Sequence, residues 1–256
     1  MYPNPIKQKL ADGQVVFGTG LAAFSPHIAG PTLDTGIDFL WIDTEHMPYG
    51  AEALDTIPVL ARQRGVAPMI RVANNDPALI KKAYDVGAVL VMVPQVNTAE
   101  EAAAAVDAAH YAPIGNRGVS PMWTRIAGQD WNETIETAND ETLLICQMES
   151  QQSWDNLDAI AAVEGVDALL IGTNDLSAEM GIPDQLTHDR ITDAYRRMIA
   201  ACRKHGKFPG MGGIYDQVLT EKFISMGVRF VQGGGDTSLM MSAGRSRMEF
   251  LNSIPL

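Results

Sequence analysis

The sequence predicts a (β/α)8 barrel, and three observations support this. Eight short apolar runs alternate with segments whose apolar residues are three and four apart, which is typical of βα units around a parallel sheet. The chain has 256 residues, a usual length for one such barrel. No linker, repeat or low-complexity segment interrupts it, so we predict a single barrel domain over residues 1–256. A doubly wound open sheet is the alternative that this pattern allows.

The eight apolar runs are the predicted strands. The first four are VVFGTG at 15–20, DFLWID at 38–43, APMIRVA at 67–73 and AVLVMVP at 88–94. The other four are TLLICQME at 142–149, DALLIGT at 167–173, FPGMGG at 208–213 and RFVQGG at 229–234.

Helical spacing is clearest in three segments between these strands: EALDTIPVLARQR at 52–64, PALIKKAYDVG at 77–87 and ITDAYRRMIAACRKHG at 191–206. Four glycines are predicted to end helices, since glycine readily adopts the left-handed conformation found there: Gly65, Gly87, Gly206 and Gly227. Residues 110–140 form the one long segment that we predict to be irregular, and loops of this length are usually functional or lid-like.

Composition excludes several classes of partner. The formal net charge is −12 and no basic stripe is present, which argues against nucleic acid and anionic membranes. The N-terminal stretch lacks the apolar core of a signal peptide, and no apolar run is long enough to span a bilayer. The two cysteines read as ordinary reduced thiols. We therefore expect a cytoplasmic protein.

Polar residues gather where the predicted strands end, which is where a barrel of this kind places its active site. The apolar run 39–42 stops at Asp43, Glu45 and His46. Arg71 interrupts the next strand, and Gln147 and Glu149 end the fifth. The sixth strand runs into Asp175, and the eighth into GGGD with Asp236.

Two of these carboxylates suggest a metal site. Glu149 and Asp175 follow adjacent strands, so both can face one point. They would repel each other without a cation, and Mg²⁺ or Mn²⁺ is the divalent ion that prefers oxygen ligands. For either acid alone, a helix cap or loop carboxylate is the alternative.

Arg71 and His46 each have two interpretations. A buried arginine is either half of a structural ion pair or a fixed fork that donates to a substrate oxygen. A histidine at a strand end is either a structural group or a proton shuttle, and the nearby Asp43 and Glu45 favour the shuttle.

None of the seven lysines falls at a predicted carboxyl end of a strand, so a Schiff-base mechanism has no obvious nucleophile. GGGD at 233–236 could cradle a phosphate or simply pack backbone closely, and we predict no nucleotide cofactor from it. GTNDLS at 172–177 presents backbone N–H groups to which a carboxylate could bind.

Several segments together resemble the HpcH/HpaI class II aldolase family, in the family's order and over about residues 14 to 240. They are WIDTEHMPYG, PMIRVANND, YDVGAVLVMVPQVNTAEEA, YAPIGNRGVS, QMES and VEGVDALLIGTNDLSAEMG. The resemblance implies a (β/α)8 barrel and a metal-dependent, reversible retro-aldol cleavage of a 4-hydroxy-2-oxo acid of the 2-keto-3-deoxy sugar acid type. The products would be pyruvate, by way of its metal-bound enolate, and an aldehyde.

The resemblance also implies roles for individual residues. Glu149 and Asp175 would bind Mg²⁺, Mn²⁺ or Co²⁺, and Arg71 would hold the keto oxygen and stabilise the enolate. His46 would be the acid/base, acting through a water on the metal. Asp85 matches a position that pairs with the histidine of a neighbouring subunit. The resemblance also places Gln147 near the metal and the substrate. The backbone around Gly172, Thr173 and Asn174 would bind the substrate carboxylate. Asp43 and Glu45 would support the site from behind.

Family members are commonly hexamers built as trimers of dimers that exchange the last helix, here about residues 237–251. The chain departs from the family at GTNDLS, where GPADLS or GPNDLS is frequent. TEHMPYG and SPMWTR also resemble the macrophomate synthase branch, whose members decarboxylate oxaloacetate before forming bonds.

Alternatives therefore stay open from the sequence. The chain could be an oxaloacetate decarboxylase or a macrophomate-synthase-like lyase that uses the same enolate. A lyase of acyl-CoA thioesters would need a basic patch, which is not seen. From another class, it could be a barrel without catalysis that binds a 2-oxo acid. Arg117 either binds substrate or orders its loop, and no role is predicted for Trp123 or Asp236.

Overall fold

Eight strands run parallel and hydrogen-bond in chain order, and the first also pairs with the last, which closes the sheet into a barrel. The computed structural model describes residues 4–255. The strands are β1 (Val16–Leu21), β2 (Phe39–Asp43), β3 (Ala67–Arg71), β4 (Leu90–Val93), β5 (Leu143–Met148), β6 (Ala168–Gly172), β7 (Phe208–Gly212) and β8 (Phe230–Gly235). The predicted (β/α)8 barrel is confirmed, and the open doubly wound sheet is excluded. Each strand ends within two residues of its predicted bounds.

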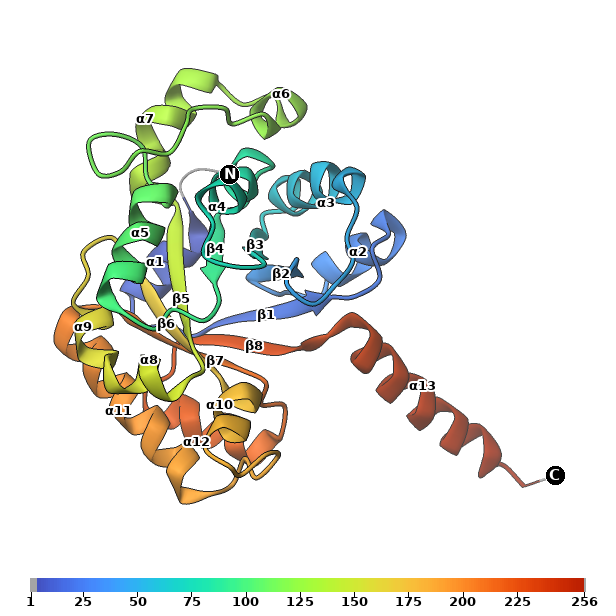
Figure 1. Cartoon of the computed structure of the whole chain (residues 1–256). Coiled ribbons are helices and arrows are strands. Elements are labelled where there is room, and N and C mark those ends of the chain that lie inside the picture. The colour runs from blue at the N-terminus through green and yellow to red at the C-terminus, as the bar shows by residue number, and fades with distance from the viewer. Residues whose placement is uncertain (1–3, 256) are drawn as a thin grey trace.

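Helices surround the barrel, except for the last one, which projects away from it (Figure 1). The first seven are α1 (Pro5–Ala11), α2 (Pro26–Leu33), α3 (Ala51–Gln63), α4 (Pro77–Asp85), α5 (Ala99–Ala109), α6 (Trp123–Ala127) and α7 (Trp131–Glu141). The others are α8 (Gln151–Asp155), α9 (Leu157–Ala161), α10 (Thr173–Glu179), α11 (Asp189–His205), α12 (Gln217–Met226) and α13 (Asp236–Asn252). The four predicted helix-ending glycines all have positive φ angles at or just after a helix end.

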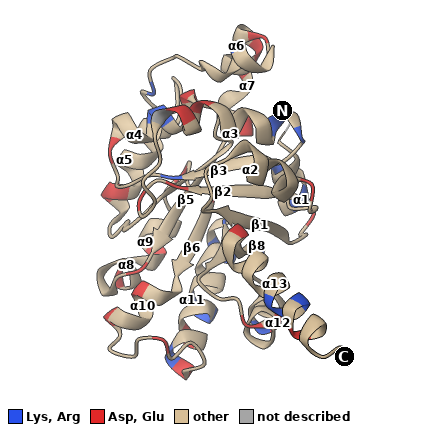
Figure 2. Cartoon of the chain, turned by 90° about the vertical axis from the view of Figure 1, so that its right-hand side faces the viewer, with Lys and Arg blue, Asp and Glu red and all other residues tan. Residues whose placement is uncertain are grey.

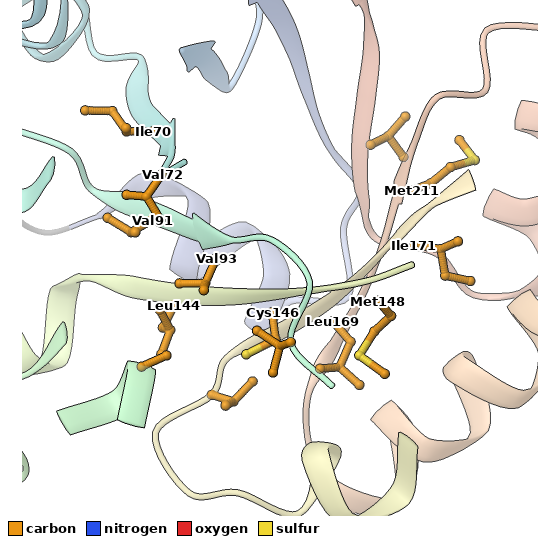
Figure 3. Close-up of a cluster of buried hydrophobic side chains, with 14 of the residues drawn as sticks. Ile70, Val72, Val91, Val93, Leu144, Cys146, Met148, Leu169, Ile171 and Met211 are labelled. Atoms are coloured by element: carbon orange, nitrogen blue, oxygen red, sulfur yellow. The ribbon is translucent and has the colours of Figure 1, made fainter. Parts of the chain in front are cut away.

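Period-two alternation along each strand separates two cores. Outward side chains such as Val91, Val93 and Leu144, which Figure 3 shows, belong to one buried cluster with side chains of the helices. Inward side chains such as Phe39, Met69 and Ile145 fill the barrel, and Ile6 and Leu10 of α1 join this inner cluster. The interior of the barrel is therefore a packed core at this level.

Residues 110–140, which we predicted to be irregular, contain the helices α6 and α7. Asp130 accepts a hydrogen bond from the Glu133 N–H and so caps α7, and α6 ends at Gly128 in the left-handed conformation. The segment leads into the start of β5, so it lies at the amino-terminal end of the barrel. Within this chain it is therefore no lid over the carboxyl-terminal end.

Two further properties of the described residues concern membranes and nucleic acid as partners. No helix among them is long and apolar enough to cross a membrane. In the view of Figure 2, Lys and Arg are spread over several helices and do not form one basic face.

Candidate active site

A cavity opens at the carboxyl-terminal end of the barrel, where barrels of this type carry their chemistry. Its volume is about 430 Å³, and residues at or just after the ends of seven strands line it. Eight of the residues predicted for the site lie in this lining: Asp43, His46, Arg71, Gln147, Gly172, Thr173, Asn174 and Asp175. The structure therefore brings together most of the groups that the strand ends predicted.

Arg71 is the cationic centre of the cavity. It is 8% exposed, and its guanidinium binds Asp43 with both arms: Nε donates to Oδ1 at 2.9 Å and Nη2 to Oδ2 at 2.6 Å. Nη1 lies 3.0 Å from Glu45 Oε2 and 3.5 Å from Gln147 Oε1. The guanidinium is thus held in one orientation by two carboxylates, and it also lines the cavity, so both interpretations of Arg71, ion pair and cavity donor, are compatible with its position.

The two acids beside Arg71 differ in their electrostatics. Burial raises the pKa of Asp43, but hydrogen bonds and charge from Arg71 outweigh burial and hold it below its usual value. Burial raises the pKa of Glu45 as well, and there the opposing charges of Arg71 and His46 do not compensate. Glu45 Oε2 is buried and makes no hydrogen bond among the described residues, although it is ion-paired with Arg71.

Glu149 stands just after β5 with both carboxylate oxygens held. Oε1 accepts from the Gln95 backbone N–H at 3.0 Å, and Oε2 accepts from Gln147 Nε2 at 2.6 Å. A Cβ at Gly172 would come within 2.5 Å of Oε2, so only glycine leaves room for this carboxylate at the end of β6. Burial and the charges of Asp175 and Glu45 raise the pKa of Glu149 to about 7.

A divalent cation fits this part of the cavity. Asp43, Glu45, Glu149 and Asp175 interact electrostatically around the guanidinium of Arg71, and burial together with the neighbouring carboxylates raises the pKa of Glu149. The described residues contain no cluster of three or more His, Cys, Asp or Glu arranged to hold a metal. Glu149 and Asp175 carry the oxygen ligands that a hard cation prefers, and water and substrate would have to supply the other ligands.

The turn from β6 into α10 offers backbone donors. Gly172 is the N-cap residue of α10, and no side chain caps this helix start. The Thr173 hydroxyl donates to the Gly212 carbonyl oxygen at 2.8 Å and lies 2.8 Å from the Tyr195 hydroxyl, so it points away from the cavity. The threonine that replaces the family's proline therefore ties α10 to β7 and α11.

His46 lies in the turn after β2, at the edge of the cavity. Its side chain is 64% exposed, and its Nε2 is 3.7 Å from Glu45 Oε2. Its backbone N–H contacts Asp43 Oδ1 at 3.4 Å, so the strand-end carboxylate also shapes the turn that carries it.

Asp85 lies outside the cavity of this chain. It ends α4, which runs back from the end of β3 toward the start of β4, so it stands near the opposite end of the barrel. Burial, opposed by the charges of Arg117 and Lys81, raises its pKa to about 6. Its Oδ1 is buried and makes no hydrogen bond among the described residues.

Arg117 and Trp123, whose roles the sequence left open, both have structural contacts. Arg117 stacks on Tyr111 at 3.7 Å and Tyr84 at 4.6 Å, and its Nη1 donates to the Ala109 carbonyl, so it orders its own segment. Trp123 is buried under the Arg62 guanidinium, 3.7 Å from its ring.

Sequence reasoning missed four groups near the cavity. Gln95 holds Glu149 through its backbone, and Tyr215 and Gln232 belong to the cavity lining. The Tyr49 hydroxyl donates to the Leu21 carbonyl, next to the cavity wall. Only Gln232 carried a visible signal, as a polar residue within an otherwise apolar and glycine-rich strand.

Comparison with known proteins agrees with this geometry. The family model described as HpcH/HpaI aldolase/citrate lyase matches residues 17–243. A 2-keto-3-deoxy-L-rhamnonate aldolase from Klebsiella pneumoniae subsp. pneumoniae is 37% identical, covering 98% of this chain and 94% of the relative. An HpcH/HpaI aldolase/citrate lyase family protein from Burkholderia cenocepacia J2315 superposes with a TM-score of 0.89 at 30% identity, covering 98% of this chain and all of the other. Macrophomate synthase, at 24% identity, 98% and 90% coverage and a TM-score of 0.81, shares the fold.

Proposed function

The chain belongs to the HpcH/HpaI aldolase/citrate lyase family, and from this premise we propose that it cleaves a 4-hydroxy-2-oxo acid of the 2-keto-3-deoxy sugar acid type into pyruvate and an aldehyde, reversibly and with a divalent metal ion. It is a carbon–carbon lyase of the class II aldolase type. The observation that carries the proposal is Glu149, a buried carboxylate that interacts electrostatically with Asp175, Glu45 and Arg71.

Glu149 and Asp175 would hold Mg²⁺, Mn²⁺ or Co²⁺. Such a cation supplies positive charge to the keto and carboxylate oxygens of a 2-oxo acid. Gln147, which lines the cavity, and the Gln95 N–H keep the carboxylate of Glu149 in place, although Glu149 is not itself part of the cavity lining.

Arg71 would stabilise the enolate that forms when the C3–C4 bond breaks. Its Nη1 is the arm that can reach a substrate oxygen, since Nε and Nη2 are committed to Asp43. Because Asp43 fixes the guanidinium in advance, little reorganisation is needed as charge develops on that oxygen. Asp43 and Glu45 are thus support groups behind the reacting atoms.

The substrate carboxylate would bind the backbone N–H groups around Gly172, Thr173 and Asn174. This helix start has no side-chain cap, so its donors are available, and it lies beside Glu149. Binding there would place the 2-oxo group between Arg71 and the two metal-holding carboxylates.

His46 would take the proton from the C4 hydroxyl and return it in the reverse reaction. Its position at the mouth of the cavity and its contact with Glu45 support this role. We further propose that Asp85 orients the histidine of a neighbouring subunit. The Asp85 oxygen Oδ1 is buried and has no hydrogen bond among the described residues, which supports a partner from outside the chain.

We propose a hexamer of three dimers that exchange α13. Apolar side chains on this helix, such as Met240, Met248 and Phe250, are more than half exposed in the single chain. An apolar groove of about 590 Å³ lies beside α12 and includes Phe17, Ile214 and Val231. In an assembly, an exchanged helix would cover such surface.

The test is exchange of the pyruvate C3 protons in D₂O, followed by NMR with Mg²⁺ or Mn²⁺ and then with EDTA. Exchange that depends on metal and is lost in His46→Ala, but not in the exposed control His27→Ala, is the expected result. Absence of exchange with every divalent metal would sink the proposal. Turnover of oxaloacetate, with no cleavage of any 4-hydroxy-2-oxo acid, would replace it with decarboxylation.

A further inference from the structure

Asp236 is a buried carboxylate that joins two parts of the chain far apart in sequence. It is 8% exposed and is the first residue of α13. Oδ1 accepts hydrogen bonds from the N–H groups of Ala22 and Thr237, and Oδ2 accepts from that of Ala23, at 2.7–2.9 Å. Residues 237–252 of α13 are exposed, so this one buried side chain links the helix to the segment after β1.

The sheet is locally irregular where it presents this carboxylate. β1 and β8 pair residue by residue until Gly18, after which the register shifts and Gly20 lies opposite Gly235. Such irregularities bend a strand and redirect the side chains that follow. Asp236 comes directly after the shift, so the orientation of its carboxylate toward Ala22 and Ala23 is part of how β8 ends.

The segment that Asp236 holds is a wall of the cavity. Gly20, Leu21 and Ala22 belong to the cavity lining. In the closed order of strands, β1 is four strands from β5 in either direction, so this wall lies across the barrel from Glu149. If pyruvate occupies the β3, β5 and β6 side, the rest of the substrate faces the β1 side.

A second tie fixes the same wall. The Tyr49 hydroxyl donates to the Leu21 carbonyl oxygen, and the Tyr49 ring packs against Phe24, with centroids 3.9 Å apart. Asp236 thus accepts hydrogen bonds from N–H groups of this wall, and Tyr49 donates one to a carbonyl oxygen of the same wall. Neither residue belongs to the lining of the cavity, so each can act only through the backbone that it holds.

We propose that Asp236 is a positioning residue that fixes Leu21–Ala23 as the wall against which the aldehyde part of the substrate lies, and that it couples this wall to α13. The inference rests on the proposed aldolase function. It separates two halves of one reaction: enolate formation from pyruvate uses the far side of the cavity, whereas addition to an aldehyde needs the β1 wall.

The experiment measures enolate formation and aldehyde addition separately in Asp236→Ala. Pyruvate C3 exchange should stay within about twofold of wild type, while the KM for glycolaldehyde in the synthesis direction rises about tenfold, since small misplacements of a binding wall are costly. Asp236→Asn keeps one acceptor oxygen, so its KM for glycolaldehyde should lie between those of wild type and Asp236→Ala. Tyr49→Phe should shift the same KM in the same direction by a smaller factor.

Asp38→Ala is the matched control. The Asp38 carboxylate also accepts a backbone N–H of β1, that of Phe17, but at the opposite end of the strand. It should lower the melting temperature without changing the KM for glycolaldehyde.

Four results decide the outcome. An unchanged KM in folded Asp236→Ala overturns the inference, as does a parallel loss of exchange and synthesis. If Asp236→Ala does not fold, the KM values of Asp236→Asn and Tyr49→Phe decide in its place. A wild-type protein without any exchange instead refutes the proposed function itself.

Discussion

At the scale of single residues, the pairing of Arg71 with Asp43 predicts a pH-dependent contribution to stability. Asp43→Asn removes one of the two carboxylates paired with the buried Arg71 guanidinium, so the free energy of unfolding at pH 7 should fall by about 1–3 kcal/mol. The pKa of Asp43 is lowered in the folded state, so its contribution is present above the unfolded pKa and is lost as the pH falls through the folded one. Urea unfolding at a series of pH values should therefore show the two proteins converging in acid.

The exposed carboxylate Asp55 on α3 provides the control for that measurement. Asp55→Asn should leave the free energy of unfolding nearly unchanged at every pH. If the difference in the free energy of unfolding between wild type and Asp43→Asn stays constant down to the lowest pH, the charge of Asp43 is not its cause.

A second prediction at this scale concerns cation binding by Glu149. Mg²⁺ or Mn²⁺ should raise the melting temperature, because a ligand at about 100 times its Kd adds about 2.7 kcal/mol to the free energy of unfolding. Glu149→Gln and Asp175→Asn should abolish the shift, and the exposed Glu52→Gln should keep it. An equal shift in all four proteins would place the cation elsewhere.

Most site residues could be predicted individually because each is a polar group at the end of an apolar run. Arg71, Glu149 and Asp175 are of this kind. Gln95 could not be predicted, because its contribution is a backbone N–H. Its φ of 51° is unusual for a residue other than glycine, and only the folded chain shows that this turn points the N–H at Glu149.

At the scale of elements, the strands were more predictable than the long connection. The strands β3 to β6 are mostly apolar and buried on both faces, and that signal is local. In residues 110–140, α6 has only five residues and buries Trp123 under Arg62 of α3. A helix that short depends on tertiary packing, so its sequence carries little periodicity.

The strand β1 gives a prediction about packing. A Cβ on Gly18 would come within 2.1 Å of the Phe39 ring, which fills the barrel interior at this level. Gly18→Ala should therefore lower the free energy of unfolding by about 1–3 kcal/mol through overpacking. Gly244→Ala, in α13 with nothing within 4 Å of the added Cβ, should be neutral or stabilising by up to about 1 kcal/mol.

A second substitution tests whether contact with Phe39 causes the loss of stability in Gly18→Ala. Phe39→Leu in the Gly18→Ala background should recover part of the lost stability in urea unfolding, since the smaller side chain vacates the space. If the two substitutions are simply additive, contact between these residues is not the source of the effect.

At the scale of the whole molecule, the single chain has one feature that its own packing does not explain. α13 extends from β8 away from the barrel (Figure 1), and its body is exposed although it carries several large apolar side chains. Contiguous exposed apolar surface is typical of association between proteins. The sequence alone suggested this helix as an exchanged element only through the family resemblance.

Association predicts that assembly and activity are lost together. Met248→Glu combined with Phe250→Glu puts charge on the exposed apolar surface of α13 and should reduce the molar mass measured by light scattering, with an unchanged circular dichroism spectrum. Because we propose that Asp85 acts on the histidine of a neighbouring subunit, the dissociated protein should also lose most of its metal-dependent pyruvate exchange. Glu249→Gln, between these positions, changes charge alone and should keep both. Full exchange activity in a monomer would show that each chain carries a complete site, and Asp85 would then be a structural residue.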